Sequence, residues 1–220
     1  MLIEFAEKLV IPEEFGTDEY GDPMGETDKL FNEINTKIDF TLGASKFVLM
    51  DKEEDIVVKI PFNGSFVYDE TDYGDACYFC PFDDYCEREA YFYEEAEEAG
   101  LSEFFAKTEY YGRTKNGVPF YVSEKVADTD YYRYHYDNDG DSKYKDRLDM
   151  LKLVNELYKK YYYETTRLWL LDAISWYGLD KTENLLKFLQ DNNINDLHGG
   201  NVGRRANGAP VIFDYSGFYE

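Results

Sequence analysis

The chain has 220 residues, of which 44% are hydrophobic and 18% aromatic, so it can bury a core and is short for two independent domains. Its formal net charge is −23, from 46 acidic and 23 basic residues. This charge repels nucleic-acid backbones and anionic membrane surfaces, and it favours basic partners. The composition therefore argues against a disordered chain and against direct nucleic-acid binding.

Hydropathy gives no sign of a membrane or export segment. No apolar run approaches the roughly 18 residues that a membrane helix needs. The opening residues 1–15 lack the basic start and long apolar core of a secretory signal. We therefore expect no membrane association and a cytoplasmic location.

The N-terminal part predicts strands after an irregular start. Residues 1–37 mix short apolar runs with turn residues and indicate only a short helix near 27–35. Residues 38–62 predict strand, turn, strand, acidic turn and strand, because the runs FVLM and IVVKI flank DKEED. Residues 63–85, rich in Gly, Asp and Tyr, predict a long loop.

A helix and a hairpin follow. Residues 86–105 predict a helix with small and aromatic residues on one face, and Gly100 is suited to end it. Residues 108–126 predict a hairpin of two aromatic strands joined by the turn KNG. Residues 127–144 are acidic and aromatic, which is typical of a surface loop.

The C-terminal part is predicted to be mainly helical. Apolar residues recur at three- and four-residue spacing from 145 to 177, and a further helix is expected over 183–193, opened by Thr182. The run VIFDYSG then predicts a buried strand that ends in a turn. The expected class is α+β, with a strand-rich first half and a helical second half.

Three cysteines gather in CYFCPFDDYC, namely Cys77, Cys80 and Cys86. Their odd number does not resemble a disulfide framework. Two interpretations stay open: partly buried structural thiols, or three zinc ligands completed by a distant group such as His135 or an aspartate.

The segment 193–217, NINDLHGGNVGRRANGAPVIFDYSG, concentrates groups that can do chemistry. Asp196 and Asn201 lie five residues apart on a glycine-containing loop, and Asp214 follows the apolar strand VIF. The turn ANGAP between them predicts a hairpin that returns Asp214 to the neighbourhood of Asn201. Two oxygen ligands on adjacent loop ends suit Mg²⁺, and a nearby carboxylate can orient or deprotonate a hydroxyl.

This pattern, D-L-H-G-G-N followed by VIFDYSG, resembles the catalytic loop of the protein-kinase-like superfamily, in particular its prokaryotic, viral and aminoglycoside- or choline-phosphotransferase-like branches. The resemblance implies that Asp196 is the catalytic aspartate. It also implies that Asn201 and Asp214 are the metal-binding residues, with Mg²⁺ and ATP as cofactors. The resemblance covers roughly residues 38–217.

The same resemblance assigns roles in the first half of the chain. The stretch LGASKFVLM looks like a shortened glycine-rich hairpin over the nucleotide phosphates, in which Gly43 is kept and Ser45 stands in as a small residue. The strand IVVKIPF is similar to the one that carries the phosphate-contacting lysine, which makes Lys59 that residue. The stretch VPFYVSEKV resembles the strand entering the hinge, with Glu124 to Val126 near the adenine through their backbone.

The resemblance also implies that the helix after the Lys59 strand supplies a carboxylate that pairs with Lys59. Glu89 is the expected partner, because the order E-A-Y-F-Y resembles the family's acidic-then-aromatic order, and Glu87 and Glu94 are the rivals. The implied fold is bilobal and kinase-like. Residues 1–127 would form an N-terminal lobe with a small antiparallel sheet, and residues 128–220 a reduced helical C-terminal lobe.

Some positions depart from the family. Ile194 and Asn195 stand where the family has His and Arg before the catalytic aspartate, and Ser216 replaces a glycine. The chain stops at Glu220, before the helices with which protein kinases hold peptides. The absence of the arginine argues against control by activation-loop phosphorylation, and the short second lobe puts a peptide substrate in doubt.

Three further residues keep two interpretations each. His198 is either a loop-organising or substrate-side residue or a hydrogen-bonded structural histidine. Arg204 and Arg205 either reach phosphate or lie exposed on the hairpin.

Two functions follow. The first is an ATP- and Mg²⁺-dependent phosphotransferase that transfers the γ-phosphoryl group to a hydroxyl, with a basic protein as a favoured acceptor. The second is a kinase-like binding protein with weak or no catalysis, a pseudokinase or an acidic inhibitor of a nucleic-acid-binding partner. The compactness and composition suit a bacteriophage or mobile element acting in a host cytoplasm.

Overall fold

A computed structural model describes residues 1–13, 15–16, 23–43, 45–62, 64–67, 77–80, 84–132, 148–161, 167–195 and 197–216. The chain divides into two compact units. Unit 1 comprises residues 1–90 and 108–124, and unit 2 comprises residues 91–107 and 125–220. This division places 91–107 in unit 2, whereas the sequence interpretation placed it in the N-terminal lobe.

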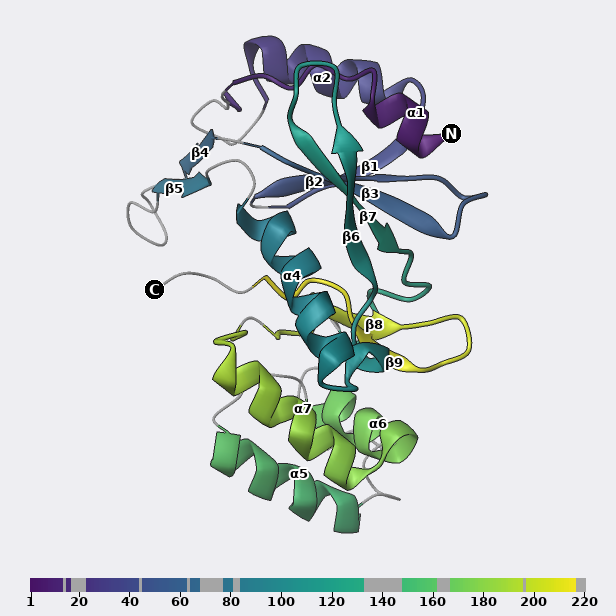
Figure 1. Cartoon of the computed structure of the whole chain (residues 1–220), viewed down its shortest axis with the longest axis vertical. Coiled ribbons are helices and arrows are strands. Elements are labelled where there is room, and N and C mark those ends of the chain that lie inside the picture. Colours follow the sequence, from purple (N-terminus) through teal and green to yellow (C-terminus); the bar gives the residue numbers. More distant parts are fainter. Residues whose placement is uncertain are drawn as a thin grey trace. The chain divides into compact units, whose positions relative to one another are not determined.

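Unit 1 is built on a five-stranded antiparallel sheet with the order β1-β2-β3-β7-β6 (Figure 1). The strands are β1 (Asp39–Leu42), β2 (Lys46–Met50), β3 (Ile56–Pro61), β6 (Thr108–Arg113) and β7 (Pro119–Glu124). A separate hairpin pairs β4 (Gly64–Val67) with β5 (Cys77–Cys80). Between β3 and β6 the chain also forms the helix α4 (Asp84–Glu98), whose first residues belong to unit 1.

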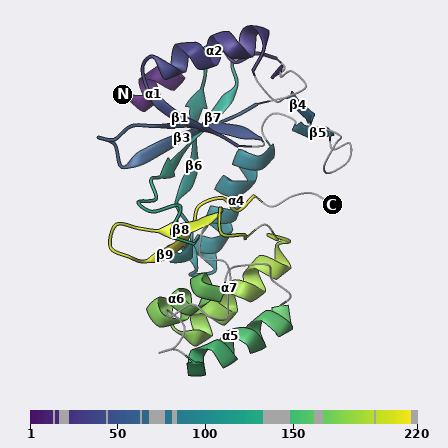
Figure 2. The same ribbon diagram turned by 180° about the vertical axis from the view of Figure 1, so that it is seen from behind.

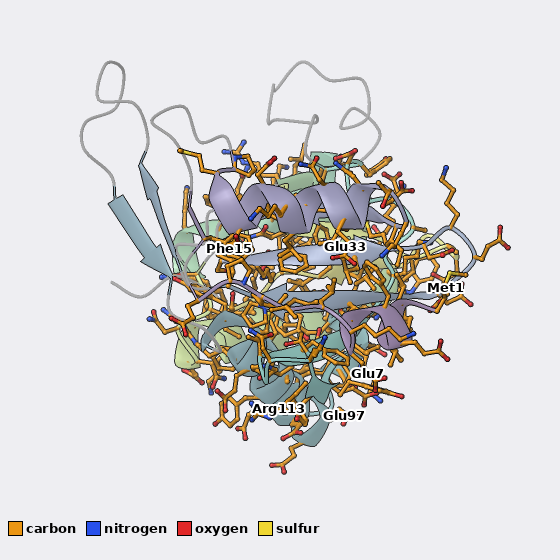
Figure 3. All side chains as sticks on the ribbon, turned by 90° about the horizontal axis from the view of Figure 1, so that it is seen from above. Met1, Glu7, Phe15, Glu33, Glu97 and Arg113 are labelled. Carbon is orange, nitrogen blue, oxygen red and sulfur yellow. The ribbon has the colours of Figure 1, made fainter. Side chains whose placement is uncertain are left out.

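One face of this sheet is covered by the N-terminal residues. Helices α1 (Leu2–Ala6) and α2 (Gly25–Asn35) lie along it (Figures 1 and 2). Phe15, which is labelled in Figure 3, stacks on Phe62 with ring centroids 4.2 Å apart and meets Phe31 of α2 edge-on. The residues that share this apolar core include Leu2, Ile11, Ile34, Phe47, Leu49, Val58, Ile60 and Phe120. The described residues of the segment 1–37, for which the sequence indicated one short helix, thus cover this face of the sheet.

The alternation of strand residues leaves a second face with a different chemistry. Because successive side chains point to opposite faces, Phe47 and Leu49 in the core imply that Lys46 and Val48 point away from it. In the same way Val58 and Ile60 lie in the core while Lys59 faces the other side. Both lysines are nevertheless buried.

The described part of unit 2 contains a group of packed helices and a hairpin. Helices α5 (Leu148–Tyr161), α6 (Arg167–Tyr177) and α7 (Leu179–Asp191) pack on one another, and α6 is buried from Leu168 to Ile174. The hairpin of β8 (Val202–Arg204) and β9 (Pro210–Ile212) packs on α6 and on the short 3₁₀ helix η1 (Ser102–Phe104). Trp169, Phe104, Phe105, Leu185 and Tyr215 are among the fully buried residues of this core.

Both α4 and α7 end in a Schellman turn. At the end of α4, Gly100 has φ +69° and Leu101 N–H donates to the Ala96 carbonyl at 2.7 Å. After α7 the left-handed position is taken by Asn193, with φ 53°. Ile194 N–H donates to the Leu189 carbonyl at 2.9 Å, and both side chains are buried. This turn starts the loop that leads to Asn201.

The α+β class is confirmed, as are the three strands in 38–62, the 108–126 hairpin and the stop at Gly100. Two details were wrong. Residues 63–85 include the β4–β5 hairpin instead of a continuous loop. Helix α7 begins at Leu179, so Thr182 lies in its first turn, where its hydroxyl donates to the Gly178 carbonyl instead of capping the helix.

Within the described part of the chain, no helix has the length and apolar character to cross a membrane.

Candidate functional site

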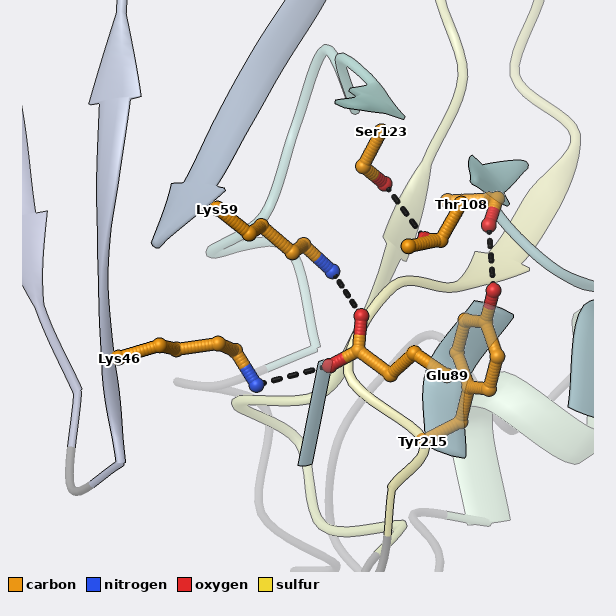
Figure 4. Close-up of polar contacts among 7 residues, drawn as sticks. Lys46, Lys59, Glu89, Thr108, Ser123 and Tyr215 are labelled. Carbon is orange, nitrogen blue, oxygen red and sulfur yellow. Dashed lines mark hydrogen bonds and ion pairs between the residues drawn. The ribbon is translucent and has the colours of Figure 1, made fainter. Parts of the chain in front are cut away.

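The expected ion pair between Lys59 and Glu89 is present. Lys59 lies in β3, Glu89 lies in α4, and the Lys59 ammonium donates to the Glu89 carboxylate Oε2 (Figure 4). Glu89 is fully buried, whereas its rivals Glu87 and Glu94 are exposed. A charge removed from water is stabilised by an opposite charge that it touches, so each residue explains the burial of the other.

A second lysine, which the sequence interpretation missed, binds the same carboxylate. The Lys46 ammonium at the start of β2 lies 2.7 Å from Glu89 Oε1, and its side chain is buried (Figure 4). The two oxygens of Glu89 therefore each accept from a different lysine. The signal was the alternation K-F-V-L-M, which puts Lys46 on the same sheet face as Lys59 once the strands pair.

The turn before Lys46 is shorter than a glycine-rich loop. Gly43 N–H donates to the Lys46 carbonyl at 2.8 Å, and residues 43–45 join β1 to β2. Gly43 is exposed and Ser45 is buried, and the Ser45 carbonyl accepts from Phe62 N–H at 3.1 Å. This backbone bond fixes Ser45 against the end of β3.

In unit 2 the structure brings Asn201 and Asp214 together as expected. Strands β8 and β9 pair Val202 with Ile212, so the residues just outside the hairpin are neighbours. The Asn201 carbonyl accepts from Phe213 N–H at 3.0 Å and from Asp214 N–H at 3.4 Å. Asn201 is 7% exposed and Asp214 is partly buried. Both side chains end in oxygen donors that suit Mg²⁺.

The backbone around Asp214 is anchored on both sides to Ala106. The Ile212 carbonyl accepts from Ala106 N–H at 2.7 Å, and the Tyr215 hydroxyl donates to the Ala106 carbonyl at 2.8 Å (Figure 4). Tyr215 is fully buried, with its ring edge-on to Phe105 at 5.0 Å. The tyrosine was visible in the motif, but nothing local in the sequence indicated its partner.

The loop before Asn201 is organised by His198. Its Nδ1 accepts from Gly200 N–H at 2.9 Å, and its carbonyl accepts from Asn201 N–H at 2.9 Å. A Cβ on Gly200 would lie 2.8 Å from the His198 ring, so glycine permits the close approach. Both interpretations of His198, as a loop-organising residue and as a hydrogen-bonded structural histidine, agree with these bonds. Asp196 lies outside the described residues.

Arg204 and Arg205 are both partly exposed, and their guanidinium groups hold the hairpin in place. Arg205 donates to the carbonyls of Glu103 at 2.7 Å and Phe105 at 2.8 Å. Arg204 pairs with the buried carboxylate of Asp172 on α6, donates to the Tyr132 hydroxyl at 3.1 Å, and lies 3.4 Å over the Tyr131 ring.

Burial and the charge of Asp172 raise the pKa of Tyr132 well above its usual range. Burial alone would lower the pKa of Arg204, but its hydrogen bonds to Tyr132 and Asp172 raise it overall. The cluster therefore holds a neutral phenol beside the ion pair of Arg204 and Asp172.

The predicted adenine-side residues lie at the end of β7 and just after it. Glu124 pairs with Ile56 as the last residue of β7. Val126 precedes a segment fastened to β8, where Ala127 and Asp128 both donate to the Arg204 carbonyl at 3.1 Å. A Cβ on Gly203 would lie 2.7 Å from the Asp128 carbonyl oxygen, so β8 needs glycine at this contact.

The structure describes one of the three cysteine side chains, for which the sequence left structural thiols and zinc ligands as alternatives. Cys86 is buried in α4, while the side chains of Cys77 and Cys80 are outside the described set, as is His135. Among the side chains that are described, no three His, Cys, Asp or Glu residues gather as a metal cluster.

No family model, no curated protein and no solved structure matches the chain.

Proposed function

We propose that the chain is an ATP- and Mg²⁺-dependent phosphotransferase with a bilobal kinase-like fold, acting on a hydroxyl acceptor. The observation that carries the proposal is the buried ion pair of Lys59 with Glu89. It joins a lysine of the third strand to a glutamate of helix α4, in a sheet of order β1-β2-β3-β7-β6. This is the arrangement by which protein kinases hold the α- and β-phosphates.

The second support is the pairing of Asn201 with Asp214. Their backbones are adjacent, and both side chains carry oxygens of the kind that Mg²⁺ binds. When bound, the metal would neutralise charge on the nucleotide phosphates. The anchors at Ala106 would keep Asp214 in position without any contribution from the ligand.

In the proposed reaction, the bond between the γ-phosphorus and the oxygen it shares with the β-phosphate breaks, and a bond from the acceptor oxygen to that phosphorus forms. Lys59 holds the phosphates that leave as ADP, and Glu89 orients the ammonium. Asp196 positions the acceptor hydroxyl and accepts its proton. The −23 charge of the chain favours a basic protein as the acceptor.

A second candidate is a binding protein that holds nucleotide with weak or no transfer. The tight turn closed by Gly43 and Lys46 favours it, because two intervening residues offer few backbone donors to cover phosphates. The high acidity favours a role against a nucleic-acid-binding partner in this case.

Transfer from γ-labelled ATP in the presence of Mg²⁺ tests the proposal. Acceptors should include a lysine- and arginine-rich protein, a bacterial lysate and water. We expect label transfer by the wild type and a loss of about a hundredfold or more in Asp214→Asn and Lys59→Met. Asp191→Ala, an exposed aspartate at the end of α7, is the matched control and should keep full activity.

Nucleotide titration of the same samples separates the outcomes. MgATP binding without transfer would favour the binding protein. A folded wild type that neither transfers label nor binds MgATP would refute both candidates.

A further inference from the structure

Glu89 is shared by two lysines, and the second one has no role in the function proposed above. Lys46 and Lys59 come from adjacent strands and reach different oxygens of the same carboxylate (Figure 4). One lysine is enough to pair with a carboxylate, and burying a further ammonium is unfavourable compared with an apolar side chain of similar size. The burial of Lys46 therefore indicates that this lysine has a role beyond pairing with Glu89.

The position of Lys46 offers that reason. Its carbonyl closes the Gly43 turn, so Lys46 lies at the turn of the LGASKFVLM hairpin, which is the stretch expected to cover the nucleotide phosphates. The pairing of β2 with β3 sets Lys46 opposite Pro61 and Lys59 opposite Val48, so both lysines lie on the same sheet face. An ammonium has three N–H donors, so a lysine that bonds a carboxylate is chemically able to contact a phosphate as well.

We propose that Lys46 is a second phosphate-binding lysine, oriented by Glu89 in the same way as Lys59. Glu89 then acts as a common support that presents two ammonium groups to one polyphosphate. The inference rests on the proposed nucleotide binding. It adds that the phosphate-binding lysines come from both β2 and β3, so a variant that loses one of them still has the other.

Binding of MgATP, MgADP and adenosine, measured by calorimetry, tests this division. The variants are Lys46→Met and Lys59→Met, with Lys46→Gln as a variant that removes the charge but keeps a donor for Glu89. We expect each to weaken MgATP and MgADP by about ten- to a hundredfold, and adenosine by less than about twofold, because adenosine has no phosphate. The exposed turn residue Lys115 provides the matched control, Lys115→Met, which should bind all three as the wild type does.

The ratio of MgATP to adenosine affinity separates phosphate contact from damage to the fold, because a merely structural lysine would weaken both ligands alike. If Lys46→Met fails to fold, the affinities of Lys46→Gln for MgATP and adenosine test the role of Lys46. Wild-type affinity for MgATP in Lys46→Gln, or an equal loss of MgATP and adenosine, would overturn the role of Lys46 and leave the proposed function standing. No MgATP binding by the folded wild type would overturn both.

Discussion

Each unit buries a charged cluster, and the two clusters use different cations. In unit 1 two lysines share the carboxylate of Glu89. In unit 2 a single arginine, Arg204, pairs with Asp172, bonds Tyr132 and stacks on Tyr131. An ammonium is a point charge on a flexible stem, whereas a guanidinium is a rigid planar fork. The lysine cluster can thus redirect its donors toward a ligand, and the arginine cluster is suited to hold three segments of chain in one arrangement.

The largest effect should come from removing the shared carboxylate. Glu89→Gln leaves two buried lysines without their common anion, and we expect the free energy of unfolding to fall by about 3–5 kcal/mol. The exposed Glu87, two residues earlier in α4, gives the control Glu87→Gln, with an expected change below about 1 kcal/mol. Urea denaturation measures both, and similar losses in the two variants would contradict the shared role of Glu89.

Replacing all three charges sharpens the same test. A variant with Met at Lys46, Lys59 and Glu89 buries apolar side chains of similar volume, and it should recover most of the stability that Glu89→Gln loses. The same variant should bind no MgATP. Recovered stability with lost binding would show that the cluster is kept for its ligand.

In the arginine cluster, exchange of one cation for another should be harmful. Arg204→Lys keeps the charge but loses the planar stack on Tyr131 and the fork that serves both Asp172 and Tyr132, so we expect a loss of about 2 kcal/mol. The exposed Arg113, whose guanidinium bonds the Gly117 carbonyl, supplies the control Arg113→Lys, with a loss below about 0.5 kcal/mol. Equal stability of Arg204→Lys and wild type would remove the distinction between the clusters.

The phenol of Tyr132 predicts a dependence on alkaline pH. Burial holds its pKa above the value of about 10 that it has in the unfolded chain, so folded Tyr132 keeps its proton while the unfolded chain releases it. Its contribution to stability is complete below pH 10 and falls as pH rises above 10, by up to about 1.4 kcal/mol per pH unit.

Tyr132→Phe should therefore be about 1 kcal/mol less stable than wild type at pH 8 and should lose less stability between pH 10 and 11. Tyr110→Phe, at an exposed tyrosine, should follow the wild type over the same range. Denaturation at each pH measures both. Parallel curves for wild type and Tyr132→Phe would contradict the raised pKa.

The smallest effect concerns the turn that leads from α7 toward Asn201. Asn193 is left-handed, so Asn193→Ala should lower the free energy of unfolding by about 1 kcal/mol, while Asn193→Gly should match or slightly exceed the wild type. Thermal unfolding distinguishes them. The order would reverse if the Asn193 side chain, and not its backbone, were the stabilising feature.

Local patterns in the sequence were enough to predict several features. The strands around DKEED, the KNG hairpin and the stop at Gly100 each follow from residues close in the chain. The neighbourhood of Asn201 and Asp214 also followed from a hairpin, because short antiparallel pairing fixes which residues meet.

The unpredicted features depend on distant partners. The sequence around Lys46 is that of an ordinary strand. Its role depends on the pairing of β2 with β3, which places it beside Lys59, and on Glu89 of α4, which bonds both lysines. Arg204 is explained by Asp172, 32 residues away, and Tyr215 by Ala106, 109 residues away. Composition near each residue carries no information about such partners. The prediction that Thr182 opens α7 was wrong for a different reason, since a threonine hydroxyl can either cap a helix or bond back within its first turn.

The hydrogen bonds of the first residues determine when the N-terminal segment can complete its folding during synthesis. Ile11 exchanges two hydrogen bonds with the side chain of Asn116, which lies 105 residues later, and Lys115 N–H donates to the Leu9 carbonyl. At a translation rate of about 5–20 residues per second, the first helix waits roughly 5–20 s for this partner. Its apolar face has no complete sheet to cover in that interval. Ribosome-bound chains stopped before residue 116 should therefore expose residues 1–13 to protease, and chains long enough to release the β6–β7 hairpin from the ribosome should protect them.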